Sequence, residues 1–348
     1  MTPAPIRDAR STPGGGRRRN LLGAWALGLA FLAGCSGKSD EVIVYTSVDS
    51  IYAEEIFAAF TRETGLVVRP VYDTEEAKTL GLVHRLIAER ARPQADVFWN
   101  GECARTAMLK REGILEPYVP AGANGIPASM RDADGAWTGF GARARVIVYN
   151  TERVKSPPRT LDELTRAEWK GRVAIANPVF GTTAAHAVAL AQSRGLEGAL
   201  RYFTALKDNG IRVVGGNSHV RDLVAGGQCD VGLTDTDDVW IGRARGDKID
   251  MVYPDQDGAG TLLVPNSAAL IKGAPHAAQA RRFLDFLLRP ATEAALARGR
   301  SRQMPVRSDV EAPADVPRVA SLRSLPIDWS SVTTSEDFFA RLRRVMGL

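Results

Sequence analysis

Short apolar runs rich in β-branched residues alternate with amphipathic helical stretches along most of this 348-residue chain, and this alternation constrains its fold most. The spacing predicts strands over residues 41–45, 66–71, 96–99, 145–149, 173–176, 211–214 and 231–233. It predicts helices over residues 51–62, 80–92, 183–193, 219–225 and 275–288. Repeated β-α-β order favours a mostly parallel sheet with helices on both faces, the α/β class.

Two extended segments, residues 139–149 and 260–271, divide this alternation into two series. Such crossings are typical of two α/β domains, or lobes, joined by a hinge. We predict a discontinuous lobe 1 over residues 41–139 plus 270–348, and a lobe 2 over residues 140–269. In open α/β sheets ligands bind beyond the carboxyl ends of the strands, so a cleft between the lobes is the expected site.

The first 34 residues have the pattern of an export signal. Three arginines at 17–19 precede an apolar run over residues 21–32, which is too short to span a bilayer as a mature helix. Leu-Ala-Gly-Cys at 32–35 then resembles a lipobox, in which Cys35 is lipidated and becomes the new N-terminus, with residues 35–40 as a linker. A plain signal peptide with an incidental cysteine, inner or outer membrane anchoring, and general secretory or twin-arginine export stay open.

The basic charge belongs mainly to this leader. The whole chain carries +5, and in residues 1–34 five arginines against Asp8 give +4, which leaves +1 for the remainder. We therefore expect no nucleic-acid partner. With Cys35 assigned to lipid, only Cys103 and Cys229 remain, and we expect two separate thiols. The four histidines include no pair at i, i+4 spacing, so we expect no zinc site.

Five stretches, in order along the chain, resemble the ferric-binding-type branch of ABC-importer solute-binding proteins. They are residues 44–47, 95–99, 169–174, 230–233 and 266–276. The resemblance implies a type II periplasmic-binding fold that clamps a small-molecule or metal ligand between two lobes. It also implies an ABC permease and its ATPase as partners, in the periplasm, and we expect a monomer with no resident cofactor.

Polar residues that follow the predicted strands are the candidate ligand contacts. They are Thr46, Ser47, Asp49, Asn100, Glu102, Gly181, Thr182, Thr183, Asn217, Ser218, Asp235, Asp237 and Asp238. Residues 181–183 and 217–218 begin predicted helices, where free backbone N–H groups and the helix dipole favour an anion. The alternative is that Thr182 and Ser218 merely cap their helices.

The resemblance assigns roles to part of this set. The family's anion contacts fall on Thr182, Thr183 and Asn217, and its ligating tyrosines fall on the acidic turn at 234–238, where this chain has none. Asp49 stands where some members have a ligating histidine, and Glu102 lies one residue from a ligating glutamate. The missing phenolates weaken an iron site, although hard cations also accept carboxylates.

Three ligand classes therefore stay open. A metal such as Fe(III) would use Asp49, Glu102, Asp235 and Asp237 together with a bound anion. An organic zwitterion would place an ammonium group at the carboxylates and a phosphonate, phosphate or carboxylate at the helix N-termini. A simple anion would use the helix N-termini alone.

The chain shows no motif of an enzyme: Gly-x-Ser-x-Gly, a phosphate-binding Gly-x-x-x-x-Gly-Lys and a dinucleotide fingerprint are all missing from the sequence. Two other functions stay open, a lipoprotein that senses a ligand and a hydrolase that uses Asp235 and Asp237 as acid and base. For a receptor, Asp235→Ala and Thr182→Ala are expected to weaken binding with little loss of stability.

Overall fold

The computed structural model describes residues 40–73, 80–330 and 336–348. The predicted signal peptide, and Cys35 with the linker as far as residue 39, lie outside these residues. Within them, no helix combines the length and apolar character needed to cross a membrane.

Strands and helices alternate over most of the described chain. The strands are β1 (Glu41–Thr46), β2 (Val67–Tyr72), β3 (Val97–Asn100), β4 (Leu115–Glu116), β5 (Thr138–Asn150), β6 (Val173–Ala176), β7 (Arg212–Val214), β8 (Val231–Asp235), β9 (Ile249–Val252) and β10 (Leu263–Ile271). The α-helices are α1 (Ser50–Thr64), α2 (Leu80–Ala88), α3 (Ala104–Arg111), α4 (Gly181–Arg194), α5 (Leu196–Asp208), α6 (Asn217–Ala225), α7 (Thr236–Ala244), α8 (Ala277–Leu287), α9 (Pro290–Arg298) and α10 (Glu336–Met346). Short 3-10 turns occur at Ala121–Gly125, Ala128–Met130, Asp162–Thr165, Ala167–Trp169 and Val319–Ser321.

The strands form one path in the order β2-β1-β3-β10-β5-β8-β6-β7, with β4 beside β10 and β9 beside β5. The pairs β1·β2, β1·β3, β6·β7 and β6·β8 are parallel, whereas each pair that includes β5 or β10 is antiparallel. The expectation of a mostly parallel sheet is therefore wrong for the centre of the path. The reason is that β5 and β10 are long strands that cross between the two series and pair with each other in opposite directions.

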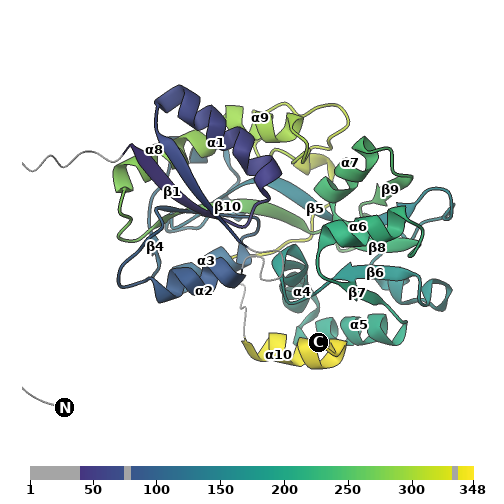
Figure 1. The fold of residues 1–348 in the computed structure, drawn as a ribbon. Helices are drawn as coiled ribbons and strands as arrows, with labels where there is room; N and C mark the ends of the chain where they lie inside the picture. The colour runs from purple at the N-terminus through teal and green to yellow at the C-terminus, as the bar shows by residue number, and fades with distance from the viewer. Residues whose placement is uncertain (1–39, 74–79, 331–335) are drawn as a thin grey trace, which may run out of the picture. The chain divides into compact units, whose positions relative to one another are not determined.

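Each half of this path carries helices on both faces (Figure 1). Around β1, β3 and β10, helices α1 and α8 lie on one side and α2 and α3 on the other. Around β6 and β8, α6 and α7 lie on one side and α4 and α5 on the other. The halves meet along β5, whose first residues pair with β10 and whose last residues pair with β8 and β9. This is the predicted two-lobe α/β architecture with extended crossings.

Helix α1 shows how the sequence pattern produces packing. Its buried residues Tyr52, Ile56 and Phe60 are four apart and form one face of the helix. Phe60 packs edge-on against Phe283 of α8, with ring centroids 5.1 Å apart. The helix ends at Gly65, whose φ of 74° lies in the left-handed region that glycine adopts most easily.

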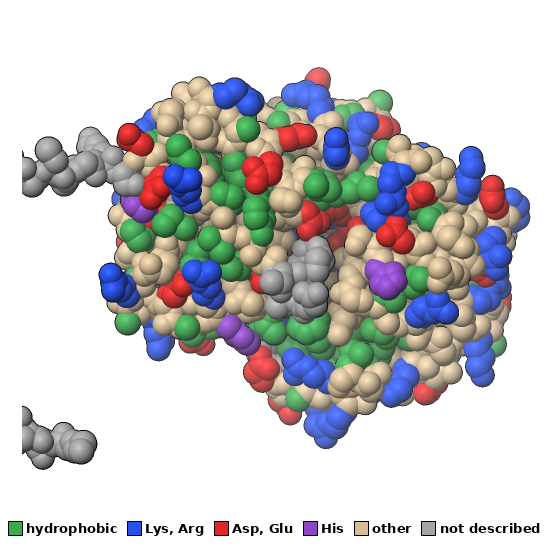
Figure 2. Space-filling view, viewed as in Figure 1, with side chains coloured by type: hydrophobic (Ala, Val, Ile, Leu, Met, Phe, Trp, Pro, Cys, Tyr) green, Lys and Arg blue, Asp and Glu red, His purple; other side chains and the backbone are tan. Residues whose placement is uncertain are grey.

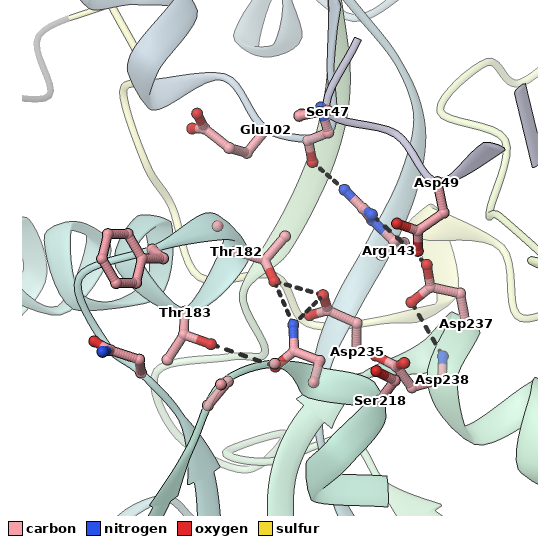
Figure 3. Close-up of a pocket in the computed structure, with 18 residues that line it drawn as sticks. Ser47, Asp49, Glu102, Arg143, Thr182, Thr183, Ser218, Asp235, Asp237 and Asp238 are labelled. Atoms are coloured by element: carbon pink, nitrogen blue, oxygen red, sulfur yellow. Dashed lines mark hydrogen bonds and ion pairs between the residues drawn. The ribbon is translucent and has the colours of Figure 1, made fainter. Parts of the chain in front are cut away.

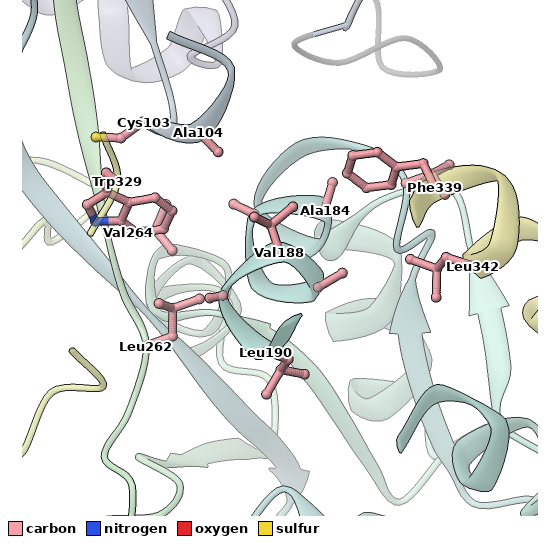
Figure 4. Close-up of a cluster of buried hydrophobic side chains, with 14 of the residues drawn as sticks. Cys103, Ala104, Ala184, Val188, Leu190, Leu262, Val264, Trp329, Phe339 and Leu342 are labelled. Carbon is pink, nitrogen blue, oxygen red and sulfur yellow. The ribbon is translucent and has the colours of Figure 1, made fainter. Parts of the chain in front are cut away.

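A second group of buried apolar side chains joins parts of the chain that are distant in sequence (Figure 4). It includes Val188 of α4 and Phe339 of α10, and Trp329 lies beside Val264 of β10. Helix α10 packs against α5, so the end of the predicted lobe 1 lies against a helix of the predicted lobe 2. The lobe boundaries themselves remain a prediction. Cys103 and Cys229 are both buried and free, as expected.

Candidate functional site

A pocket of ≈ 70 Å³ lies beside the ends of β1, β3, β6, β7 and β8. In Figure 2 acidic side chains gather near the middle of the face, whereas lysines and arginines are spread mostly around its rim. The pocket is lined by Ser47, Asp49, Gly101, Glu102, Arg143, Ala176, Asn177, Phe180, Gly181, Thr182, Thr183, Gly215, Gly216, Asn217, Ser218, Asp235, Asp237 and Asp238.

The structure brings all but two of the predicted contact residues to this pocket. The exceptions, Thr46 and Asn100, are fully buried and each hydrogen-bonds within or next to the loop that follows β1. The Ser47 hydroxyl donates to Oδ1 of Asn100 at 2.5 Å, and Oγ1 of Thr46 accepts from the Val48 N–H at 3.1 Å. These two residues therefore orient the loop that follows β1.

Two helices begin at the pocket wall without a capping side chain. Helix α4 starts at Gly181 after Phe180, and α6 starts at Asn217 after Gly216; neither Phe180 nor Gly216 makes a side-chain cap. The capping alternative for Thr182 and Ser218 is therefore wrong. The first-turn N–H groups of a helix have no partner within the helix, so both N-termini offer donors and partial positive charge to the pocket.

The carboxylate of Asp235 is engaged in a buried hydrogen-bond network and is not available to a ligand. Its Oδ1 accepts from Arg145 at 2.7 Å, and its Oδ2 accepts from the Thr182 hydroxyl at 2.5 Å and from Asn217 Nδ2 at 3.0 Å. Arg145 is fully buried and Asp235 nearly so. The network ties β5, α4, α6 and β8 together, so Thr182 and Asn217 meet the ligand space mainly through their backbones.

Arg143 is the charged pocket residue that the predicted contact set did not include. It lies on β5, donates to the carbonyl of Gly101, and places Nη1 3.6 Å from Oδ2 of Asp237. Burial alone would lower the pKa of Arg143, but Asp237, Asp235 and Asp49 raise it above its usual range, so the guanidinium stays charged. Figure 3 shows Asp49, Asp237 and Arg143 grouped on one side of the pocket.

Asp238 completes a cluster with Asp235 and Asp237, in which one oxygen of each residue lies within 4.8 Å of the others. The Thr234 hydroxyl donates to Asp238 at 3.0 Å, and Nη1 of Arg221 lies 3.8 Å away. Burial, and then the charges of Asp237 and Asp235, raise the pKa of Asp238 well above its usual range. Each of the three aspartates thus faces an arginine: Arg145, Arg143 or Arg221.

Glu102 does not join this cluster. Its carboxylate accepts from Asn100 Nδ2 at 2.9 Å and from the Arg105 N–H at 3.1 Å, and Figure 3 shows it directed away from the aspartates. Burial raises its pKa despite the opposing effect of the Asn100 hydrogen bond. Among the described residues, neither Asp49 nor Glu102 belongs to the group that could hold a metal, so the structure does not assemble the predicted four-carboxylate set.

Replacement of Asp238 by Asn is expected to stabilise the fold at pH 8 by a few degrees in Tm and to have little effect near pH 4. The folded protein holds the Asp238 proton to higher pH than the unfolded chain, whose aspartates titrate near about 3.9. The free energy of unfolding therefore falls as pH rises from that value through the raised pKa of Asp238 in the folded protein. An Asn at this position does not titrate, so the variant does not lose this stability. Thermal unfolding at both pH values checks it, with the exposed Asp257→Asn as the matched control; an equal gain at both would contradict it.

Comparisons with known proteins agree with the fold. The family model described as "Bacterial extracellular solute-binding protein" matches residues 95–331. Iron uptake protein A1 of Synechocystis sp. is 30% identical over 279 residues, which cover 76% of this chain and 76% of that protein. A putative 2-aminoethylphosphonate-binding periplasmic protein of Salmonella paratyphi A is 25% identical over 291 residues, covering 80% and 83%.

Among solved structures, iron-bound HitA from Pseudomonas aeruginosa superposes with a TM-score of 0.79 at 23% identity. The match covers 88% of this chain and 99% of that one. Relatives named for iron and for a phosphonate therefore share one fold with this chain, and the choice between such ligands depends on the pocket itself.

Proposed function

Because this chain belongs to the bacterial extracellular solute-binding proteins, we propose that its pocket captures a small organic zwitterion with a phosphonate or phosphate end for an ABC importer. The family consists of solute-binding transport proteins, so the chain is not an enzyme. Capture and release of an unchanged solute need a closing pocket and no nucleophile.

The convergence of two uncapped helix N-termini on one pocket carries this proposal. The starts of α4 and α6 both line the pocket, together with the charged Arg143. Helix N-termini bind phosphate-like groups through their free N–H groups and their dipoles, and Ser218 adds a hydroxyl donor. An oxyanion of a phosphonate or phosphate has enough acceptor oxygens to use several of these donors together.

The acidic side of the pocket supports an ammonium group as the other end of the ligand. Asp49, Asp237 and Asp238 all line it. A charge-assisted hydrogen bond from an ammonium to a carboxylate contributes about 1.5–3 kcal/mol. One relative is named for 2-aminoethylphosphonate, a zwitterion with an ammonium group at one end and a phosphonate at the other.

Ferric iron is the second candidate cargo, and the three clustered aspartates favour it. Two observations count against it. Each of these carboxylates faces an arginine, and the residues that line the pocket, all of them in the described chain, include neither Tyr nor His. Fe(III) would have to compete with guanidinium groups for its oxygens.

We expect the two lobes to close on the ligand by bending at the crossing strands β5 and β10. Arg143 on β5 touches Gly101, which follows β3, and faces Asp237 at the start of α7. A ligand that bridges both sides of the pocket stabilises the closed form relative to the open form, and a permease can recognise the closed form.

The export signal supports the remaining parts of the proposal. A lipidated Cys35 would hold the protein at a membrane facing the periplasm, and an ABC permease with its ATPase would receive the solute. We expect the solute-binding unit to be a monomer. A sensory lipoprotein would use the same pocket with another partner.

Native mass spectrometry and thermal shift of the Cys35→Ser mature protein test the ligand class. At about 1,000 times its Kd, a ligand stabilises the fold by roughly 4 kcal/mol. We expect aminophosphonates to raise Tm strongly, the corresponding simple amines and phosphate to raise it less, and Fe(III)-citrate to leave it unchanged. Stabilisation by Fe(III)-citrate alone, or a chelator-sensitive iron mass in the purified protein, would overturn the zwitterion in favour of iron.

A further inference from the structure

The side chain of Arg143 occupies an unusual position for a charged residue. It lies at the end of the part of β5 that pairs with β10, opposite Val264, and two residues further on Arg145 pairs with Asp235 of β8. Its side chain therefore emerges where β5 passes from one half of the sheet to the other. Only 8% of Arg143 is exposed, although it lines the ligand pocket.

Its contacts put a positive charge among the pocket carboxylates. Nη1 lies 3.6 Å from Asp237, while Nη2 donates to the Gly101 carbonyl, which fixes the guanidinium in place. Asp49 and Asp237 are both close enough to raise its pKa. The guanidinium thus stands beside the oxygens that an incoming metal ion would need.

One N–H donor of the Arg143 guanidinium is unpaired within the described part of the protein. Nε of Arg143 is buried and has no hydrogen-bond partner among the described residues. A buried unpaired donor lowers stability, and in a residue that lines a pocket it is a candidate donor to a ligand. An acidic ligand group can supply it, whereas a metal ion cannot.

We propose that Arg143 determines the charge specificity of the pocket, by excluding multivalent metal ions from the cluster of Asp235, Asp237 and Asp238 while it admits an acidic organic ligand. This inference rests on the proposed function and adds to it the residue that separates this pocket from a metal site. A guanidinium at this position repels a trivalent ion at close range, in surroundings where water screens the charge poorly. A monovalent ammonium meets a smaller repulsion, and its ligand brings an anionic group as well.

The test is titration of the Cys35→Ser protein with Tb(III), a hard trivalent ion whose luminescence rises when carboxylates replace its water. We expect weak binding by the parent, and binding about tenfold tighter or more in Arg143→Gln, which removes the charge but keeps a donor for Gly101. Arg143→Lys keeps the charge and should behave as the parent. Adding Asp237→Asn to Arg143→Gln should remove the gain.

Arg143→Met provides a second neutral variant if Arg143→Gln unfolds. Equal Tb(III) affinity in the parent and in the folded neutral variants overturns the role of Arg143, and so does a gain that survives Asp237→Asn. Neither result tests the proposed function. That function is tested separately, by the thermal shift of the parent protein with aminophosphonates. Aminophosphonate affinity should fall in both neutral variants, because the Nε donor and the charge are lost.

Discussion

Arg145→Met is expected to lower the free energy of unfolding by about 3–5 kcal/mol, the usual consequence of removing one member of a buried ion pair. Arg145 is fully buried, and its loss leaves Asp235 charged and without its 2.7 Å partner in the interior. Urea unfolding followed by circular dichroism measures the change. Arg153→Met is the matched control, because Arg153 also pairs with a buried aspartate but has a side chain that is 54% exposed; it should lose about 1 kcal/mol or less.

The double variant Arg145→Met/Asp235→Leu separates a lost pair from lost packing. Removing both charges should restore much of the stability, since the uncompensated carboxylate disappears. A single-variant loss below about 1 kcal/mol would contradict the importance of the pair. The same geometry changes our expectation for Asp235→Ala, which would leave Arg145 buried without its carboxylate and should be destabilising as well as harmful to binding.

Ser218→Asp is expected to weaken binding of a phosphonate or phosphate ligand by about a hundredfold or more, while the fold stays as stable as the parent or slightly more stable. Ser218 is exposed in the first turn of α6 and lines the pocket. A carboxylate there interacts favourably with the helix dipole, by about 0.3–1 kcal/mol. The same charge faces the ligand's anionic group, and like charges in contact cost several kcal/mol.

Calorimetric titration together with thermal unfolding checks both halves of this expectation. Ser218→Asn has a similar size and no charge, so it should bind within a few-fold of the parent. If Ser218→Asp binds an aminophosphonate as tightly as the parent does, the ligand's acidic end does not lie at the start of α6. A loss of binding that comes with a lower Tm would indicate unfolding instead of repulsion.

Local periodicity was enough to predict the elements that position the site. The apolar alternation at residues 41–45, 96–99 and 231–233 corresponds to β1, β3 and β8, and the polar residues after these strands reach one pocket. This works because strand ends and the loops that follow them are encoded by neighbouring residues. Helices α3, α5, α7, α9 and α10 were not predicted. For α3 and α7 the reason is that their apolar faces are short and that each buries a charged residue, Arg105 or Asp237.

The partners of the site residues could not be predicted in the same way. Asp235 ends β8 and Asp237 lies in the first turn of α7, only two residues further on, yet one pairs with Arg145 and the other faces Arg143. The choice depends on the antiparallel register between β5 and β8, in which Arg145 lies opposite Asp235. Arg143 lies in the extended segment predicted at residues 139–149, and the fold shows that it lines the pocket.

The antiparallel pairing of β10 with β3 and β5 also constrains how the chain is made. β10 lies between β3 and β5 in the sheet, with Ser267 opposite Asn100, although nearly half of the 348-residue chain separates the two residues in sequence. During synthesis, the half of the sheet that contains β1, β2 and β3 therefore cannot be completed until residues 263–271 of β10 have left the ribosome. The strands β6, β7 and β8 of the other half are synthesised earlier. Long-range pairing of this kind slows folding, so the ligand pocket, which both halves of the sheet contribute to, forms late.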